Sequence, residues 1–493
     1  MNVDSFPLLM IIISYVLGFF GVLFGILRKN IRFSKFITLA TSVIHLVLSL
    51  FVLKYTLTNG QFIYNAGHYE APWGVELMIG NVEAIFGVLF AFVYFIVTWY
   101  SFETLKREIS ETRIGIYYFL TNILIGSLLG VVFTNDIFNS YVFIEIGTLA
   151  ACGIIVIKNK KDNFLATIKY LVLSNLGSGL FLMGIAFMFS ITGNLNMSFI
   201  HKEIAQNHAS YTNVILVSTA LFTIGLGIKS ALFPVHTWLP DGHSSAPTTS
   251  SPLLSALVIK AFFYLYVKVL YRALGVDLPE VHYIFTVLLV LGCVGMIAGS
   301  LLAIVQGELK RTIAYSTVAQ MGYIFFGLGL GTKTGLVFAF YHVIAHALAK
   351  SILFLSSGSM VNYTGSKMIS SLSGIGRKMP VELLTFTLAS MSMVGIPMLP
   401  GFVSKWNLAT ESAHMGNFLL VGIVLISGLL NAFYYFPIIV RGFFMVPDEE
   451  AEGTTVDAVY SPHRIVPLLL LSAGLVYAGI NSENIINAFL SGL

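Results

Sequence analysis

The chain has 493 residues, of which 57% are hydrophobic and 10% are charged, and its mean hydropathy is +0.86. A soluble domain carries about 25% charged residues, so this composition excludes ordinary soluble packing and predicts a polytopic membrane protein. The formal net charge of +4 does not indicate a nucleic-acid partner.

Cofactor signatures are missing from the sequence. Its two cysteines, Cys152 and Cys293, both fall inside apolar stretches and form no Cys-x-x-Cys spacing, so we expect neither a disulfide framework nor a zinc or iron–sulfur site. There is also no Gly-rich phosphate loop, which argues against a nucleotide-driven pump or a flavin enzyme. We therefore expect no cofactor, no bound metal and no catalytic residues in the enzymatic sense.

Apolar windows of membrane length predict fourteen transmembrane helices in an all-α polytopic fold. The first window follows no basic leader and is too long for the apolar core of a signal peptide, so we expect it to be retained. The fourteen windows are residues 6–27, 34–53, 79–101, 114–133, 136–157, 164–192, 212–232, 251–273, 283–305, 312–330, 334–360, 380–408, 417–440 and 464–482.

Lysines and arginines near the span ends are distributed unequally between the two sides. One side holds 17: Arg28, Lys29, Arg32, Lys35, Lys106, Arg107, Arg113, Lys158, Lys160, Lys161, Lys310, Arg311, Lys367, Arg377, Lys378, Arg441 and Arg464. The loops of the other side hold five: Lys54, Lys202, Lys268, Arg272 and Lys333. The positive-inside rule then predicts that both termini lie outside, which suits an even number of spans.

The remaining five basic residues are all lysines predicted at membrane depth: Lys169, Lys229, Lys260, Lys350 and Lys405. Ionisable residues inside a membrane are functional hypotheses by default. A desolvated ammonium loses its proton readily, whereas a guanidinium does not, so lysine suits a group that must load and unload a proton. For Lys169, a side chain that snorkels to the surface is an equally good explanation.

Helix breakers occur in two related spans. The seventh contains "GLGIKSALFPVHTWLP" and the twelfth contains "MVGIPMLPGFVSKW", each with glycine, two prolines, a lysine and a tryptophan. Proline removes a backbone hydrogen bond and breaks or kinks a helix. Interrupted helices at matching points of two halves indicate an ion or substrate site at the interface of an internal repeat.

One carboxylate lies well inside a predicted span. Glu145, in the fifth span, could pair with Lys229 and hold its proton until the pair opens. A purely structural ion pair is the alternative, although buried pairs rarely add net stability. Asp136, at the start of the same span, is better explained as a helix N-cap.

Histidines add a polar seam to the eleventh span. His342, His346 and Lys350 recur at every fourth position and so share one face of a helix, where histidine can pass protons. Ordinary buried histidines are the alternative, and a zinc site is disfavoured because no third ligand is evident. His236 and His243, in the proline-rich segment, either gate proton access or are ordinary loop histidines.

Five segments carry a family resemblance: "FTNDIFNSYVFIEI", "KYLVLSNLGSGL", "ALFPVHTWLPDGHSSAP", "LKRTIAYSTVAQMGYIFFGLGLG" and "HVIAHALAKSILFLSSGS". They resemble the antiporter-like subunits shared by Mrp-type Na+/H+ antiporters, respiratory complex I and membrane-bound hydrogenases. Lys405, where some members have glutamate, is similar to the Mrp D-type subunit and its hydrogenase relatives. His243 and Ser245 depart from the commoner D-type pattern.

The resemblance implies two inverted five-helix repeats with helices 7 and 12 broken. We expect residues 1–112 to hold helices 1–3, residues 113–275 the first repeat with helices 4–8, residues 276–442 the second repeat with helices 9–13, and residues 443–493 a loop and helix 14. The resemblance also implies a water-linked lateral proton route through the Glu145–Lys229 pair, the central Lys260, the eleventh-span histidines and Lys405.

Three functions follow as hypotheses. The first is a proton-translocating subunit of a multi-subunit monovalent cation (Na+)/proton antiporter in a prokaryotic plasma membrane, with other membrane subunits, H+, Na+ and the lipid bilayer as partners. The second is the same fold serving as the ion pump of a hydrogenase or complex I-type enzyme, whose redox centres belong to partner subunits. The third, a transporter of a small organic solute, is disfavoured because the broken helices carry mainly lysines and histidines.

Overall fold

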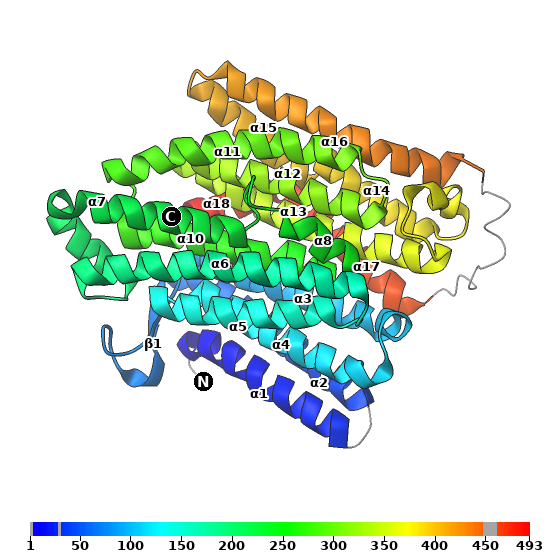
Figure 1. The fold of residues 1–493 in the computed structure, drawn as a ribbon, viewed down its shortest axis with the longest axis horizontal. Coiled ribbons are helices and arrows are strands. Elements are labelled where there is room, and N and C mark those ends of the chain that lie inside the picture. Colours follow the sequence, from blue (N-terminus) through cyan, green and yellow to red (C-terminus); the bar gives the residue numbers. More distant parts are fainter. Residues whose placement is uncertain (1–2, 28–30, 447–460) are drawn as a thin grey trace.

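Long helices run side by side along one direction in the computed structural model, which describes residues 3–27, 31–446 and 461–493 (Figure 1). In this part of the chain the elements are η1 (Val3–Ser5), α1 (Phe6–Leu27), α2 (Ile31–Asn59), β1 (Phe62–Asn65), η2 (Ala66–His68), β2 (Glu76–Ile79), α3 (Asn81–Glu108), α4 (Glu111–Phe133), α5 (Ile137–Val156), α6 (Lys161–Thr192), α7 (Met197–Lys229), α8 (Trp238–Ser245), α9 (Ser250–Pro252), η3 (Leu253–Val258), α10 (Ile259–Lys268), η4 (Val269–Leu274), α11 (Pro279–Ile304), α12 (Leu309–Gly329), α13 (Lys333–Thr364), η5 (Ile369–Leu372), η6 (Ile375–Arg377), α14 (Pro380–Val394), α15 (Pro400–His414), α16 (Phe418–Phe444), α17 (Pro462–Ile480) and α18 (Ser482–Leu490).

The predicted polytopic all-α fold is confirmed. Within the described residues, twelve helical segments are long and apolar enough to cross a membrane, and they coincide with twelve of the predicted windows. The tenth window corresponds to α12, whose 21 residues span about 31 Å at 1.5 Å per residue. The twelfth corresponds to the pair α14 and α15, so fourteen predicted spans have helical counterparts.

Both predicted helix breaks are present. The seventh span ends as a regular helix at Lys229, and α8 begins at Trp238 after an irregular stretch that contains Pro234. The twelfth span is interrupted between Val394 and Pro400, where Gly395 takes a φ of 102° that suits glycine at a helix C-terminus. The helix ends at the break of the seventh span, Lys229 and Trp238, are buried, whereas the break of the twelfth reaches the surface at Ile396 and Met398, which are 39% and 81% exposed, and buries Met393 at the end of α14.

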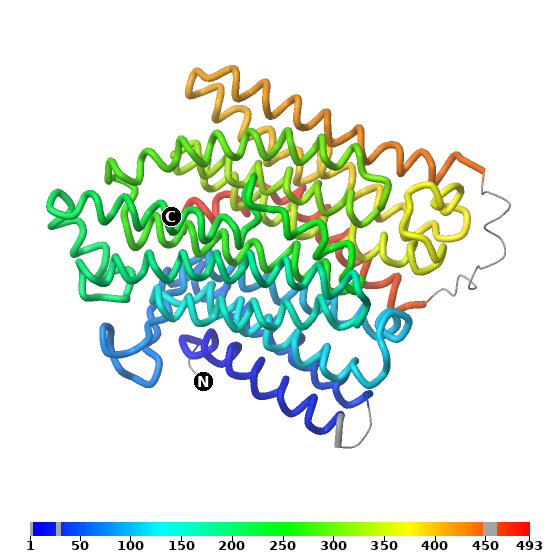
Figure 2. The backbone as a smooth tube through the Cα atoms, viewed as in Figure 1, coloured from blue at the N-terminus to red at the C-terminus, as the bar shows by residue number. Residues whose placement is uncertain are grey.

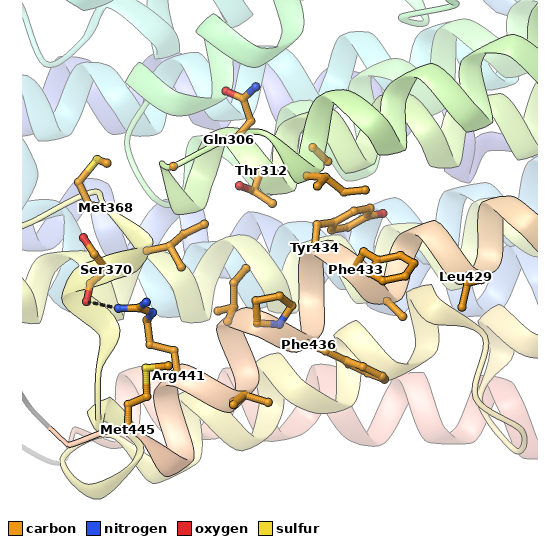
Figure 3. A pocket seen from close by; sticks show the side chains of 18 residues that line it. Gln306, Thr312, Met368, Ser370, Leu429, Phe433, Tyr434, Phe436, Arg441 and Met445 are labelled. Atoms are coloured by element: carbon orange, nitrogen blue, oxygen red, sulfur yellow. Dashed lines mark hydrogen bonds between the residues drawn. The ribbon is translucent and has the colours of Figure 1, made fainter.

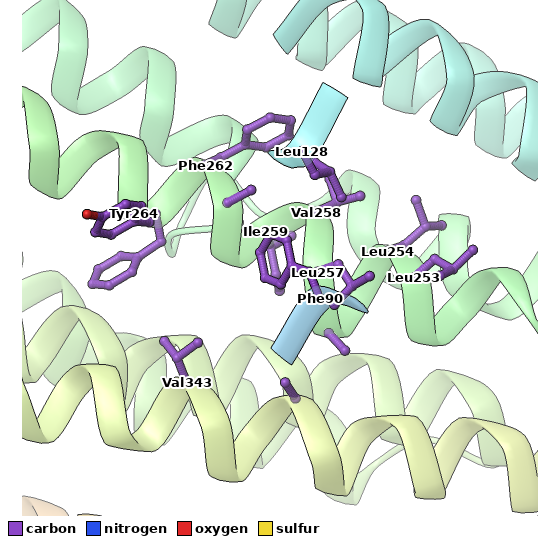
Figure 4. Close-up of a cluster of buried hydrophobic side chains, with 14 of the residues drawn as sticks. Phe90, Leu128, Leu253, Leu254, Leu257, Val258, Ile259, Phe262, Tyr264 and Val343 are labelled. Atoms are coloured by element: carbon purple, nitrogen blue, oxygen red, sulfur yellow. The ribbon is translucent and has the colours of Figure 1, made fainter. Parts of the chain in front are cut away.

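Two spans form the centre of the bundle. The segment Ser250–Leu274 is buried along its whole apolar window, and Lys333–Thr364 is 94% buried, whereas α1 at the edge is only 28% buried. Figure 4 shows the apolar packing between these central spans, with Val343 facing the helix that carries Ile259 and Phe262. A helix that is apolar all round belongs in such a core, and Lys260 and Lys350, one on each of these two spans, are both 0% exposed.

Two backbone bridges connect the ends of spans in a similar way. Asp136, before α5, pairs with Asn196, before α7, and Glu308, before α12, pairs with Met368, ahead of α14. The first bridge joins the starts of the fifth and seventh spans, and the second joins the starts of the tenth and twelfth. This correspondence suits the predicted repeats, whose inverted arrangement and boundaries stay predictions.

The bundle has two distinguishable ends. At one end lie the antiparallel hairpin of β1 and β2, with Phe62 opposite Ile79, the start of α1 and the end of the chain (Figure 2). We call it the hairpin end. The opposite end carries the segment of η5 and η6 and the connections with most lysines and arginines, and we call it the basic end.

The sequence-based grouping of basic residues needs one correction. Lys268 is the last residue of α10 and is only 1% exposed, and Arg272 lies in η4, so neither belongs to a loop. The predicted loop position was wrong because the last turns of this span, in π-helical form, keep both side chains against neighbouring helices. Arg28 and Lys29, which also entered that grouping, lie outside the described residues, as does most of the predicted loop before helix 14.

Candidate functional site

Glu145 and Lys229 are brought together as predicted. Lys229, the last residue of α7, is 2% exposed, and its Nζ lies 3.8 Å from Oε1 of Glu145. The same Nζ donates a 2.7 Å hydrogen bond to Oγ1 of Thr148, which follows Glu145 by three residues on α5. One face of α5 therefore offers the ammonium two alternative partners, one charged and one neutral.

Glu145 also reaches the surface of the bundle. Its side chain is 30% exposed, and Phe138, Val142 and Leu149 on the same face of α5 are 38–62% exposed. A carboxylate exposed to hydrocarbon at membrane depth is costly. This face therefore calls for a covering protein surface rather than lipid.

Lys260 lies at the centre of the bundle and is fully buried. Its Nζ donates a 2.6 Å hydrogen bond to the carbonyl of Ser255, which belongs to the π-helix η3. Among the described residues, no carboxylate lies within 4.0 Å of this amine, so no fixed negative charge holds a proton on it. π-helical turns inside longer helices often mark functional sites, and sequence periodicity gave no sign of this one.

The predicted histidine face of α13 is buried and partly hydrogen-bonded. Nδ1 of His342 lies 2.7 Å from Oγ of Ser404, and its Nε2 lies 3.1 Å from Oε1 of Gln320. The ring of His346 follows at 6.3 Å, and neither of its nitrogens has a hydrogen-bond partner among the described residues. Both ring nitrogens of the fully buried His243 also have no hydrogen-bond partner among the described residues, and this ring stacks on Phe354 at 4.9 Å.

Lys350 continues this face into a network of hydroxyls. Its Nζ donates to the carbonyl of Ile313 at 2.8 Å and to Oγ of Ser316, which lies 2.9 Å from the hydroxyl of Tyr435. Lys260, His243, His346 and Lys350 also lie within electrostatic range of one another. The two central spans and α8 thus bring four of the predicted residues into one buried cluster.

Lys405 occupies the break of the twelfth span. Its Nζ donates to the carbonyls of Met393 and Val394, the last residues of α14, and lies 4.6 Å from the ring centroid of Tyr323. The C-terminus of a helix carries partial negative charge and unpaired carbonyls, which favour a cation. The helix break therefore supplies the acceptors that a lysine at this depth requires.

Two of the predicted residues lie apart from this cluster. Lys169 is 62% exposed and pairs with Asp241 at 2.5 Å, and Arg311 contacts the other oxygen of that carboxylate at 3.2 Å. These three residues line a small polar cavity of about 230 Å³ at the basic end. His236 is 5% exposed and stacks on Phe233 at 5.1 Å, beside the break of the seventh span.

Sequence reasoning missed several buried charges. Glu83 is 0% exposed and Glu108 is almost completely covered, although both belong to α3, which otherwise reads as an apolar span. A carboxylate inside the predicted window 79–101 was the available signal for Glu83. The partners of these carboxylates could not be read from sequence because they come from distant helices.

A cavity of about 820 Å³ between α11 and α16 is not part of this chemistry. Its walls are mainly apolar, with Gln306, Thr312 and Ser370 at its edge and Arg441 donating to the Ser370 carbonyl at 3.2 Å (Figure 3). None of the predicted path residues lines it. Except for the partly exposed Glu145, these residues instead lie among packed side chains in the interior of the bundle.

Comparison with known proteins identifies the family. The family described as NADH:quinone oxidoreductase/Mrp antiporter, TM matches residues 134–431. The N-type subunit of the NADH-quinone oxidoreductase of Desulforudis audaxviator is 32% identical over 98% of this chain and 97% of its own. The D-type subunit of the Na(+)/H(+) antiporter of Alkalihalophilus pseudofirmus is 28% identical over 96% of this chain and 94% of its own.

Solved structures agree with this assignment. A chain of the membrane-bound sulfane sulfur reductase, an archaeal respiratory membrane complex, superposes with a TM-score of 0.90 and 28% identity, covering 98% of this chain and 96% of that one. A chain of the Mrp complex from Dietzia sp. DQ12-45-1b superposes with a TM-score of 0.87 and 19% identity, covering 100% and 97%, which shows the shared fold. The chain therefore belongs to the NADH:quinone oxidoreductase/Mrp antiporter transmembrane family.

Proposed function

We propose that this chain is the proton-translocating subunit of a multi-subunit antiporter that exchanges protons for sodium or another monovalent cation. The observation that carries the proposal is a series of titratable side chains that begins at the partly exposed Glu145 and continues through buried residues of the bundle, namely Lys229, Lys260, His346, Lys350 and Lys405. Two relatives named as D-type components of Na(+)/H(+) antiporters, at 28% identity over 96% of this chain, support it.

The Glu145–Lys229 pair acts as the switch of this route. While the carboxylate lies near Nζ of Lys229, the ammonium is stabilised and keeps its proton. When the carboxylate moves away or is neutralised, Lys229 retains only the neutral oxygen of Thr148 and can release the proton. Histidine can both accept and donate near neutral pH, which suits His346 to the step between Lys260 and Lys350.

Water is the natural link between these groups. Buried polar atoms in proteins are nearly always hydrogen-bonded, either to protein or to ordered water. The ring nitrogens of His243 and His346 have no partner among the described residues, so they are the expected contact points of such waters. Lys405, with the Tyr323 ring at 4.6 Å, is the proposed terminal carrier, and His236 and Lys169 are proposed to control access at the basic end.

The proposed setting is a prokaryotic plasma membrane, with both termini outside and other membrane subunits as partners. The partly exposed carboxylate of Glu145 on an apolar face of α5 supports a partner subunit at that face. The chain itself is proposed to carry ions and to perform no redox step. Residues 113–275 and 276–442 are proposed as the two repeats, the first of which contains Lys260 and the second His342 and His346.

Replacement of Lys260 tests the proposal. Lys260→Met keeps the volume and removes a buried charge, so we expect the complex to assemble normally while sodium-dependent proton exchange in vesicles falls at least tenfold. Lys333→Met is the matched control, because Lys333 lies exposed at the start of α13. Unchanged exchange in Lys260→Met would remove the central step of the route.

A second function is supported by two other matches. The relative that is 32% identical is a subunit of an NADH-quinone oxidoreductase, and the structure with a TM-score of 0.90 comes from a respiratory complex. The same proton route could then be driven by electron transfer in partner subunits. Purification of the native complex separates the two: co-purifying iron–sulfur centres favour a redox-driven pump, and sodium-driven exchange without them favours the antiporter.

A further inference from the structure

Three charged residues that the proposed route does not use meet at the hairpin end of the central span. We call Glu83, Lys268 and Arg272 the hairpin-end triad. Nη2 of Arg272 lies 2.6 Å from Oε1 of Glu83, which also accepts a hydrogen bond from the hydroxyl of Tyr264. The second oxygen of Glu83 accepts from the backbone N–H of Gly80 at 2.8 Å.

Each member of the triad has contacts that favour its charged form. Lys268 donates to the carbonyls of Val131, Val132 and Thr134 at 2.7, 3.0 and 2.7 Å, so all three ammonium donors are used at the end of α4. Arg272 stays protonated in proteins. Glu83 accepts three hydrogen bonds, one of them from the guanidinium. Two cations and one carboxylate give the triad a net charge of +1.

The triad lies on the helix that carries Lys260. Lys260, Tyr264, Lys268 and Arg272 recur at every fourth position, so they lie along one side of this span. Lys268 is about 12 Å from Lys260 along the axis at 1.5 Å per residue. A proton that left Lys260 along its own helix toward the hairpin end would have to pass the triad.

The space between Lys260 and the triad is apolar. The Tyr264 ring stacks on Phe86 at 4.8 Å and lies 5.8 Å from Phe340. Figure 4 shows the Tyr264 ring beside the apolar cluster that includes Ile259 and Phe262, with its hydroxyl directed away from these side chains. An apolar layer followed by a net positive charge opposes the passage of any cation.

A similar group lies at the other end of the same span. Lys158 contacts Glu108 at 2.9 Å, Glu108 accepts from the backbone N–H of Thr248 at 2.9 Å, and Lys310 donates to the hydroxyl of Thr248 at 3.3 Å. Thr248 precedes the start of the span by two residues. The central segment thus begins and ends beside one carboxylate and two cations.

We propose that the hairpin-end triad is an electrostatic seal that prevents protons and small cations from passing between Lys260 and the water at the hairpin end. This inference rests on the proposed proton route, because a route within the membrane plane conserves the ion gradient only if neither face leaks. The seal depends on net positive charge, which distinguishes it from an ion pair that merely fastens α3 to η4.

The test compares passive proton leak among variants of different triad charge. Arg272→Gln lowers the net charge to zero, whereas Glu83→Gln combined with Arg272→Gln restores +1 through Lys268. The leak of the purified complex in liposomes is followed with an internal pH-sensitive dye after a valinomycin-imposed potassium potential, without sodium. We expect Arg272→Gln to leak roughly fivefold faster, from one unit charge about 18 Å from Lys260 along the axis, at 1.5 Å per residue, and an effective dielectric constant of about 20. The double variant should leak no faster than the wild type.

Two further variants keep the result interpretable. Arg107→Gln, at an exposed pair with Glu103 at the basic end, should leave the leak unchanged. Arg272→Lys keeps the charge without the guanidinium geometry, so its proton leak should equal that of the wild type. The seal is refuted if Arg272→Gln is as tight as the wild type, or if the double variant or Arg272→Lys leaks as fast as Arg272→Gln. Sodium-driven exchange is measured in the same liposomes, so failure of the proposed function is detected separately.

Discussion

Replacement of Glu145 by glutamine is the most direct perturbation of the proposed route. It keeps the size and shape of the side chain and removes the charge that faces Nζ of Lys229 at 3.8 Å. Two unit charges about 4 Å apart attract by roughly 4 kcal/mol at an effective dielectric constant of about 20. Because about 1.4 kcal/mol corresponds to a tenfold change, we expect exchange to fall by up to about three orders of magnitude when this carboxylate is neutralised.

Replacement of Thr148 measures the contribution of the neutral partner of Lys229, for comparison with that of Glu145. Thr148→Val removes the hydroxyl that accepts from Lys229 at 2.7 Å and leaves the volume nearly unchanged. A hydrogen bond to a charged group contributes about 1.5–3 kcal/mol, so we expect a roughly tenfold to hundredfold loss of exchange. Glu145→Gln should lose more than Thr148→Val, since it removes the charged partner.

The assay is the recovery of acridine-orange fluorescence when sodium is added to energised everted vesicles that contain the whole complex. Glu103→Gln is the matched control, because its exposed pair with Arg107 at 3.3 Å should contribute no more than about 1 kcal/mol. Immunoblotting confirms equal amounts of the protein in the membrane. Wild-type exchange in Glu145→Gln would refute the switch, and a greater loss in Thr148→Val than in Glu145→Gln would show that the hydroxyl is the principal partner.

The remaining predictions concern Lys405 and Asp136. Lys405→Ala and Lys405→Arg should both reduce exchange at least tenfold. Alanine removes the amine, and arginine can contact the α14 carbonyls but cannot release a proton. Wild-type exchange in Lys405→Arg would show that Lys405 only caps the helix. Asp136 caps α5 by accepting from the N–H of Asn139 at 2.6 Å, so Asp136→Ala should lower the unfolding free energy of the complex by about 1 kcal/mol, measured as a lower Tm in detergent. Burial raises the pKa of Asp136, so the folded state binds this proton more tightly than the unfolded chain and this residue's contribution to stability grows as the pH falls. Asp136→Asn keeps the cap and should abolish that part of the pH dependence; an identical Tm profile would contradict the assignment.

The fold could be predicted because membrane spans depend on local composition. A window of apolar residues needs no knowledge of its neighbours, and both helix breaks were marked by prolines such as Pro234 and Pro400. Lys260 and Glu145 were found for the same reason, since a charge inside an apolar run is conspicuous in any sequence. The N-cap at Asp136 also follows from local chemistry, and the structure confirms it.

Tertiary packing decided the features that sequence could not supply. Lys169 and Lys268 both looked like lysines near a span end, yet Lys169 turns outward to Asp241 and Lys268 turns inward to α4. The related ends of α6 and α13 escaped notice because a shared Thr-Gly pair is too short to stand out in a sequence. In both, glycine follows threonine, Gly193 with φ 63° and Gly365 with φ 69°, and the threonine hydroxyl accepts from the N–H two residues on.

Helix ends inside the bundle explain why lysines recur at this depth. A helix C-terminus leaves carbonyls without intrahelical partners, and a buried carbonyl needs a donor. Lys405 donates to the carbonyls at the end of α14, and Lys268 donates to those at the end of α4. At the break of the twelfth span and at the end of α4, the helix end therefore supplies acceptors and a lysine satisfies them.

The number of backbone carbonyl acceptors then separates Lys268 from Lys260. An ammonium has three donors. Lys268 uses all three on carbonyls and stands beside the Glu83–Arg272 pair, so deprotonation would leave a carbonyl unpaired and Lys268 is expected to stay charged. Lys260 has one such bond, to Ser255, and no carboxylate within 4.0 Å in the described part of the chain, so losing its proton sacrifices little. On this argument Lys260 conducts and Lys268 seals, although both are buried lysines two turns apart on the same helix.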